Sequence, residues 1–186
     1  MISFLVRTPL RRDILKLINV DIPIARYQGC IIVMCHTPWK RLLTEWCLEK
    51  KYALIIGKVK RTDRRWAIQR EGAGLSELYE LLKYLELGGP VIVMADIFNN
   101  LKNCPLKLLG SEYNASVFAE RLAILAKVPI FTVIAKLSNA RIEFAEGPQF
   151  FTEGLKSTST IITTEIISFF EKEIGNDPAI FEKYVE

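Results

Sequence analysis

The sequence predicts an α/β protein: a single layered domain in which a mixed, mostly parallel β-sheet is flanked by helices. Strand-length apolar runs alternate with amphipathic helical segments along most of the chain. Two strands are separated only by the turn Ser138-Asn139-Ala140, so we expect one antiparallel pair in an otherwise parallel sheet. Half of the 186 residues are hydrophobic, which is enough for a sizeable core.

The predicted elements alternate along the chain. Apolar spacing predicts helices over residues 10–19, 38–51, 75–87, 114–127 and 160–174. Mostly apolar runs of strand length predict strands over residues 30–35, 52–59, 90–95, 129–137 and 141–145.

Local sequence features support individual elements. Pro38 suits the first turn of the helix that follows it. Helix 75–87 is expected to end at Gly88-Gly89 and to bury four leucines: Leu78, Leu81, Leu82 and Leu85. The run Pro90–Ala95 is apolar throughout, which is typical of a strand covered on both faces.

The chain divides into a short basic segment and the layered domain. Residues 1–28 contain the amphipathic helix Leu10–Asn19, which either packs on the domain or lies on a membrane surface. Residues 29–186 form the α/β domain. Met1–Val6 is too short and wrongly flanked for a signal peptide, and no apolar run approaches the roughly 18 residues that span a bilayer.

Charge and cysteine content narrow the choice of partners and location. The net charge of +4 suits acidic partners such as anionic headgroups, phosphorylated sugars or an acidic carrier protein. The four cysteines have no C-x-x-C spacing and only one histidine is present, so we expect no structural zinc site. We expect reduced, buried thiols in a cytoplasmic protein, with peripheral contact to the inner face of the membrane as a further option.

His36, the only histidine, stands where the strand 30–35 meets the next predicted helix. Open α/β sheets carry their chemistry outside the carboxyl ends of the strands. A helix N-terminus lowers the pKa of an adjacent imidazole and favours its neutral, proton-accepting form. The two interpretations that remain open are a catalytic or ligand-binding histidine and a histidine that merely satisfies a strand end.

Other polar groups are expected at the same edge of the sheet. Asp96 follows the strand Pro90–Ala95, where it either orients the imidazole or caps the following loop. The segment Lys58–Arg65 holds five cations and one acid, among them Lys60 and Arg61, and is suited to binding phosphates. Arg70 precedes a two-glycine turn whose amides are a weaker candidate for binding an anion.

The order of these motifs resembles the lysophospholipid acyltransferase superfamily, and within it the bacterial enzymes that add secondary acyl chains to lipid A. The resemblance covers roughly residues 29–184. It rests on the strand ending in His36, the basic strand end Val59-Lys-Arg61, and the run from Leu85 to Asp96 that matches L-x-x-G-x-x-V-x-x-x-x-D. The P-L-x-x-L-G stretch 105–110, Leu125-Ala126 before a P-x-F strand, and Asp177-Pro178 complete the series.

The resemblance implies a function and assigns roles. In that family a histidine acts as general base on an acceptor hydroxyl, which attacks an acyl thioester; here that would be His36. The family's arginine and second aspartate fall on Arg61 and Asp96. The acyl donor would be acyl carrier protein or acyl-CoA, used as a co-substrate, with no tightly bound cofactor and no metal.

The family motif is H-x-x-x-x-D/E, and this chain departs from it because Arg41 stands at the acidic position. A cation there cannot accept the imidazole N–H and disfavours the imidazolium that base catalysis creates. Asp96 could orient His36 instead, and Arg41 could join Lys60, Arg61 and Arg70 in binding substrate. The alternative is a non-catalytic acyl- or lipid-binding member that acts as a partner subunit in a biosynthetic complex. Nucleic-acid binding through 58–65 is not expected, because few aromatic residues interleave with the cations.

Overall fold

The structure is a computed structural model of the whole chain, and it describes residues 28–35, 54–56, 67–68, 75–95, 104–108, 111–138, 141–156 and 158–176. The strands within these residues are β1 (Ile31–Met34), β2 (Leu54–Ile56), β3 (Ala67–Ile68), β4 (Val91–Met94), β5 (Cys104–Leu108), β6 (Ser111–Ala115), β7 (Ile130–Ser138) and β8 (Arg141–Phe150). The helices are α4 (Leu75–Glu86), α5 (Phe118–Ala126) and α6 (Ile161–Asn176).

The main sheet has six strands in the order β3-β2-β4-β1-β7-β8. Every neighbouring pair from β3 to β7 is parallel, and only β7 with β8 is antiparallel. The predicted mixed, mostly parallel sheet and its single antiparallel pair are therefore confirmed. Strand order does not follow chain order, because the helical crossovers return the chain to the opposite side of a strand already laid down.

The two central strands are buried on both faces. Successive strand residues point to opposite faces, so Ile31 and Val33 of β1 lie on one face and Ile32 and Met34 on the other. All four side chains are at most 4% exposed. The continuous apolar sequence of β1 and β4 follows from this double coverage.

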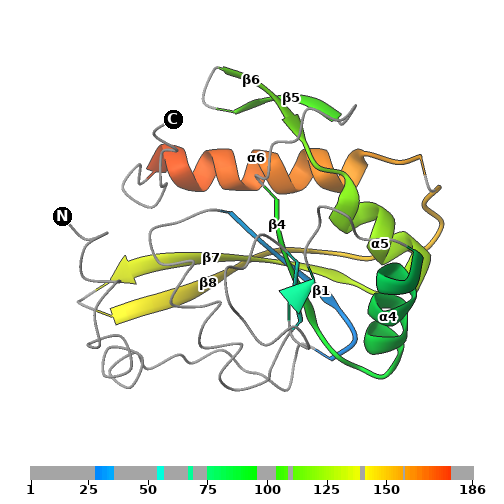
Figure 1. Cartoon of the computed structure of the whole chain (residues 1–186). Helices are drawn as coiled ribbons and strands as arrows, with labels where there is room; N and C mark the ends of the chain where they lie inside the picture. The colour runs from blue at the N-terminus through cyan, green and yellow to red at the C-terminus, as the bar shows by residue number, and fades with distance from the viewer. Residues whose placement is uncertain are drawn as a thin grey trace.

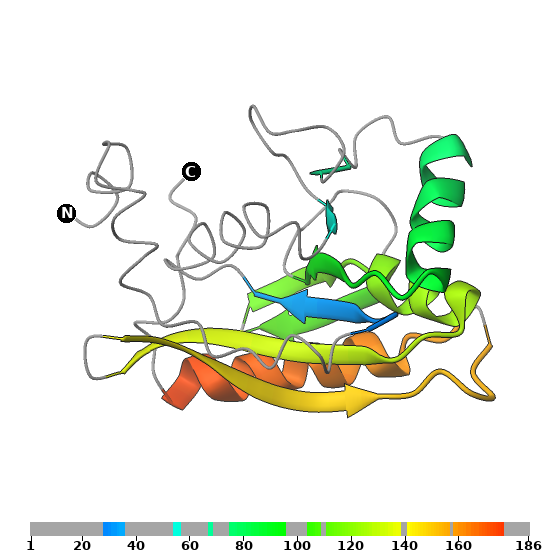
Figure 2. The ribbon, with the colours of Figure 1, turned by 90° about the horizontal axis from the view of Figure 1, so that it is seen from below.

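Helices α5 and α6 cover one face of the sheet. Their buried side chains join alternate residues of β1, β4 and β7 in one apolar core. Figure 1 shows α6 lying between the main sheet and the separate β5–β6 hairpin, and β5 contacts this helix. In Figure 2, α4 stands away from the sheet with one end near α5, which it contacts.

The β7–β8 pair contains a bulge near the amino-terminal end of β7. The pairing shifts by one residue between Phe131↔Gln149 and Val133↔Glu146. Thr132 fills this interval, and its hydroxyl donates a 2.7 Å hydrogen bond to the Pro148 carbonyl oxygen. A proline is tolerated here because a bulged edge strand does not need its amide for the ladder.

Several element boundaries agree with the sequence-based expectations, and others were wrong. The helix expected over 114–127 begins only at Phe118, because residues 111–115 form β6. Strand β8 runs to Phe150 rather than ending at 145, and β3 was not foreseen. Of the strand expected over 52–59, the structure describes only Leu54–Ile56, which forms β2. Leu81 and Leu85 of α4 are buried, whereas Leu78 and Leu82 are only partly buried.

Three expectations concern residues that the structure does not describe. The helices predicted over 10–19 and 38–51 lie outside the described residues. The basic segment 1–28 also lies outside them, except for its last residue, so its separation from the α/β domain stays a prediction.

Gly147 is required at the bulge because a side chain there has no space. A Cβ on Gly147 would meet the Phe169 ring and the Thr132 hydroxyl oxygen. We predict that Gly147→Ala lowers the free energy of unfolding by about 1–3 kcal/mol through overpacking. Urea denaturation measures this change.

Gly175 provides the matched control for Gly147. It lies in α6, and a Cβ there would meet nothing within 4 Å. Gly175→Ala should be neutral or raise the free energy of unfolding by up to about 1 kcal/mol, because alanine is the better helix former. Equal effects of the two substitutions would contradict the steric explanation.

Candidate functional site

The carboxyl edge of the sheet between β1 and β4 is the candidate site. The two strands are parallel neighbours, paired from Ile31↔Val91 to Met34↔Met94. The Ala95 amide donates a 2.8 Å hydrogen bond to the Met34 carbonyl oxygen, so the pairing continues one residue past β4. The two strands that precede His36 and Asp96 therefore end beside each other at the same level, as the sequence predicts.

Neighbouring strands extend this edge on both sides. On one side β2 pairs with β4 in parallel, so its carboxyl end faces the same edge. On the other side, β7 pairs with β1 as far as Val133↔Met34 and then continues to Ser138 alongside β8. Figure 2 shows β7 and β8 running past the end of β1, so a two-stranded arm flanks the edge.

The residues that the sequence assigns to the site follow these strands but lie outside the described residues. They are His36, Arg41, Lys60, Arg61, Arg70 and Asp96. Their roles therefore stay predictions. The described strands supply the framework: Cys35 and Ala95, the last described residues before His36 and Asp96, are 2% and 6% exposed.

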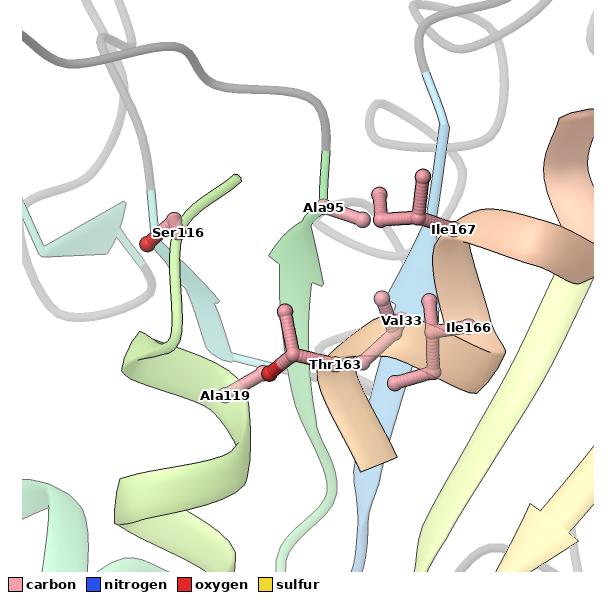
Figure 3. A pocket seen from close by; sticks show the side chains of 7 residues that line it. All are labelled: Val33, Ala95, Ser116, Ala119, Thr163, Ile166 and Ile167. Carbon is pink, nitrogen blue, oxygen red and sulfur yellow. The ribbon is translucent and has the colours of Figure 1, made fainter. Parts of the chain in front are cut away.

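A small cavity lies directly beneath this edge, between the sheet and α6. It measures about 10 Å³, which is close to the minimum for one water molecule. Its lining comes from β1, α5 and α6, together with the residue after β4 and the residue after β6: Val33, Ala95, Ser116, Ala119, Thr163, Ile166 and Ile167. Figure 3 shows that the aliphatic side chains of Val33 and Ile166 meet there, while the Thr163 hydroxyl turns toward α5. The space is apolar and too small for a substrate.

A buried carboxylate joins α5 to the first turn of α6. Glu120 is fully buried, and among the residues whose burial the structure describes it is the only buried one with a charged side chain. One carboxylate oxygen accepts hydrogen bonds from the Thr163 amide at 2.9 Å and the Thr163 hydroxyl at 2.6 Å. The other accepts a longer bond, 3.4 Å, from the Ile162 amide.

These bonds satisfy the amino end of α6. The first amides of a helix have no partner within the helix and carry partial positive charge, so a carboxylate is a favourable acceptor. The two flanking amides are paired as well, Ile161 with the Ser159 hydroxyl oxygen and Thr164 with the Thr160 carbonyl oxygen. The first turn of α6 has no acid of its own, and Glu120 supplies one from another helix.

The sequence interpretation missed Glu120. An acid in the first turn of α5 is ordinarily explained by the dipole of its own helix. The available signal was the absence of any acid in the Ser/Thr-rich start of α6, which leaves its amides in need of an acceptor from elsewhere. That signal does not identify which carboxylate accepts hydrogen bonds from these amides.

The two cysteines of the β1 region, Cys30 and Cys35, are buried, as expected, and neither forms a disulfide within the described residues. Burial raises the pKa of the Cys30 thiol from 9.0 to about 12. Because the thiolate is the reactive form, Cys30 is unsuited to nucleophilic chemistry. Among the described residues, no three side chains suited to metal binding come together.

Comparisons with known proteins add no family assignment. A scan against protein-family models and a search of curated proteins match nothing to this chain. Within the part of the chain that the structure describes, no helix has both the length and the hydropathy needed to cross a bilayer.

Glu120 makes a testable contribution to stability. We predict that Glu120→Ala lowers the free energy of unfolding by about 1.5–3 kcal/mol, because it leaves buried amides and a hydroxyl without their charged acceptor. Glu165→Ala is the control: Glu165 is exposed on α6, the helix that Glu120 contacts, so its loss should change stability by no more than about 0.5 kcal/mol. Equal losses in the two variants would contradict the role of the buried carboxylate.

The raised pKa of Cys30 predicts a pH dependence of stability. Between pH 9 and about 12 the unfolded chain releases the thiol proton while the folded chain keeps it. Stability is therefore lost as the pH rises through this window, and the contribution is fully present below pH 9. Urea denaturation at several pH values should show a shallower decline for Cys30→Ala than for the wild type.

Alkylation gives a second measurement of the same property. Peptide-resolved mass spectrometry at pH 8 should find Cys30 unmodified by iodoacetamide in the folded protein and modified in urea. Rapid alkylation of folded Cys30 would contradict the burial and the raised pKa.

Proposed function

We propose that this protein is an acyltransferase that moves an acyl chain from a carrier thioester to a hydroxyl or amine of a lipid or biosynthetic intermediate. The observation that supports the proposal most is that β1 and β4 are parallel neighbours and end at the same height in the sheet. Residues that follow neighbouring parallel strands share one edge of a sheet, which is where α/β proteins bind substrates. In this chain those residues are His36 and Asp96.

The proposed mechanism uses His36 as the general base. Its neutral imidazole removes the proton of the acceptor group as that oxygen or nitrogen attacks the thioester carbonyl carbon. The tetrahedral intermediate collapses, the carbon–sulfur bond breaks, and the imidazolium returns the proton to the departing thiolate. Asp96 accepts a hydrogen bond from the other ring nitrogen and so orients the base.

The cations bind the donor in this proposal. Arg61 and Lys60 follow β2, the parallel neighbour of β4, and Arg70 lies further along the chain. Together with Arg41 they contact the phosphate of CoA or the acidic surface of acyl carrier protein. We place the reaction in the cytoplasm, with the basic surface in contact with the carrier or the inner face of the membrane. The acyl thioester is the co-substrate, and no tightly bound cofactor is required.

One observation favours a second candidate function. The acid that orients the histidine in this superfamily is replaced by Arg41. If Asp96 does not take over that role, His36 lacks an acceptor for its second ring nitrogen. The protein would then bind acyl chains or lipids without catalysing transfer, as a partner subunit in a biosynthetic complex.

A transfer assay tests the proposed function. The purified protein is incubated with radiolabelled acyl–acyl carrier protein or acyl-CoA and a panel of lipid, hydroxyl and amine acceptors. We predict that His36→Ala lowers the transfer rate by about 10²–10⁴-fold, the usual contribution of a general base. Asp96→Asn should lower kcat by a smaller factor, because it keeps the geometry but loses the charge.

The control and the contrary outcomes are as follows. Lys156→Ala changes an exposed residue beyond the opposite end of β8 and should leave transfer unchanged. Transfer that survives His36→Ala would remove His36 as the base. An absence of transfer with every donor, together with retained binding of acyl chains, would favour the non-catalytic candidate.

A further inference from the structure

Exposed apolar side chains gather at the edge of the sheet opposite the candidate site. At this edge β1, β4 and β7 begin and the antiparallel β8 ends. Backbone hydrogen bonds join the segments along it: the Gly29 amide donates to the Gly88 carbonyl oxygen at 2.8 Å, and the Ile31 amide to the Pro129 carbonyl oxygen at 3.0 Å. Figure 2 shows that the end of α4, helix α5 and the segment from β8 to α6 all lie at this end of the sheet, which we call the amino edge.

Three of the six large apolar side chains that are exposed among the described residues lie at the amino edge. Leu87 follows α4 and is 78% exposed, Leu125 lies in the last turn of α5 and is 56% exposed, and Phe151 follows β8 and is 67% exposed. The partly buried Val128 and Phe150 lie close to them in sequence and extend the apolar surface. Exposed apolar side chains that cluster in this way mark an interaction site, whereas single scattered ones need no explanation.

Cations concentrate at the same edge. Of the eight lysines and arginines among the described residues, four lie within one helical turn of Leu87 or Leu125 or on the segment 151–160. They are Lys83, Arg121, Lys127 and Lys156. Only two of the eleven acids of the described residues, Glu86 and Glu153, share these positions. The amino edge is therefore the basic end of a described framework in which acids otherwise outnumber cations.

We propose that the amino edge binds the surface of an anionic lipid bilayer. Leu87, Leu125 and Phe151 enter the interface between headgroups and acyl chains, and the four cations contact lipid phosphates. The three apolar side chains come from the ends of three separate elements, each with a cation nearby. This arrangement matches a bilayer interface, where apolar side chains meet acyl chains while flanking lysines reach the charged headgroups. The inference does not rest on the proposed function.

The backbone at Lys127 gives this residue a special value for the test. Lys127 ends α5 with a φ of 55° and a ψ of 43°, the left-handed conformation that favours glycine at this position of a helix. Among the described residues it is the only non-glycine residue with a positive φ. Lys127→Gly therefore removes the charge and relieves the backbone at once, so weaker lipid binding by this variant cannot come from unfolding.

The test is co-sedimentation of the full chain with vesicles of phosphatidylcholine alone or of phosphatidylcholine mixed with phosphatidylglycerol. We expect the wild type to bind the mixed vesicles more tightly than the neutral ones. Leu87→Gln and Phe151→Gln should each lower the partition coefficient about three- to tenfold, because each loses apolar area that the bilayer buries. Lys127→Gly and Lys156→Gln should each lower it about fivefold on the mixed vesicles and leave binding to neutral vesicles unchanged.

Two matched controls come from the far ends of the same framework. Leu75 is also an exposed leucine of α4, but it begins the helix and lies about 18 Å along the helix from Leu87. Lys172 is exposed near the far end of α6. Leu75→Gln and Lys172→Gln should leave binding to both kinds of vesicle unchanged. Urea denaturation should find Lys127→Gly at least as stable as the wild type.

Several outcomes would overturn the proposal. One is a wild type that binds neither kind of vesicle. Another is binding that survives all four amino-edge substitutions, which would assign membrane contact to a different part of the chain. Equal losses in Leu75→Gln and Leu87→Gln would show that the position of the leucine does not matter. A wild type that self-associates in size-exclusion chromatography without binding vesicles, and that Leu87→Gln and Phe151→Gln make monomeric, would show an interface between copies of the chain instead.

Discussion

The parallel pairing of β1 with β4 and β7 is the constraint on which the rest of the structure depends. β1 lies between two parallel neighbours, and its side chains are buried on both faces of the sheet. A slip of one residue in either pairing would move Ile31 and Val33 to the wrong face. The apolar sequence does not by itself resist such a slip, because both faces accept aliphatic side chains. The packing of α5 and α6 against one face of the sheet therefore helps to fix the register of β1.

Helix α6 is held against the core by an apolar face and, at its amino end, by a polar contact. Its buried face is aliphatic and aromatic, and such packing alone tolerates small sliding movements. The Glu120 carboxylate adds direction, because its hydrogen bonds to Thr163 require a defined geometry. A buried charge of this kind is costly unless every bond is made. A displacement of α6 relative to α5 would therefore break the hydrogen bonds of Glu120 as well as the apolar contacts with the sheet.

The sequence predicted the sheet well, because strand and helix periods are local properties. The apolar runs before His36 and Asp96 predict strands without reference to the rest of the chain, and the leucine spacing of α4 predicts a helix in the same way. The short turn at 138–140 indicated the antiparallel pair. The β5–β6 hairpin was missed because its two short strands contain Pro105, Lys107 and Glu112, residues that are uncommon in strands. Glu120 was missed because its partners are distant in sequence. For the candidate site, the strand ends could be predicted, whereas a contact that depends on where two helices meet could not.

The bulge at Gly147 and Pro148 has a consequence for behaviour in concentrated solution. β8 is the outermost strand of the described sheet on its side, and an outer strand can recruit another chain. Pro148 offers no amide to an incoming strand, and the kink beside it interrupts the straight edge that fibrillar stacking needs. The bulge in which Gly147 lets α6 approach the sheet therefore also discourages edge-to-edge association of β8 with another chain.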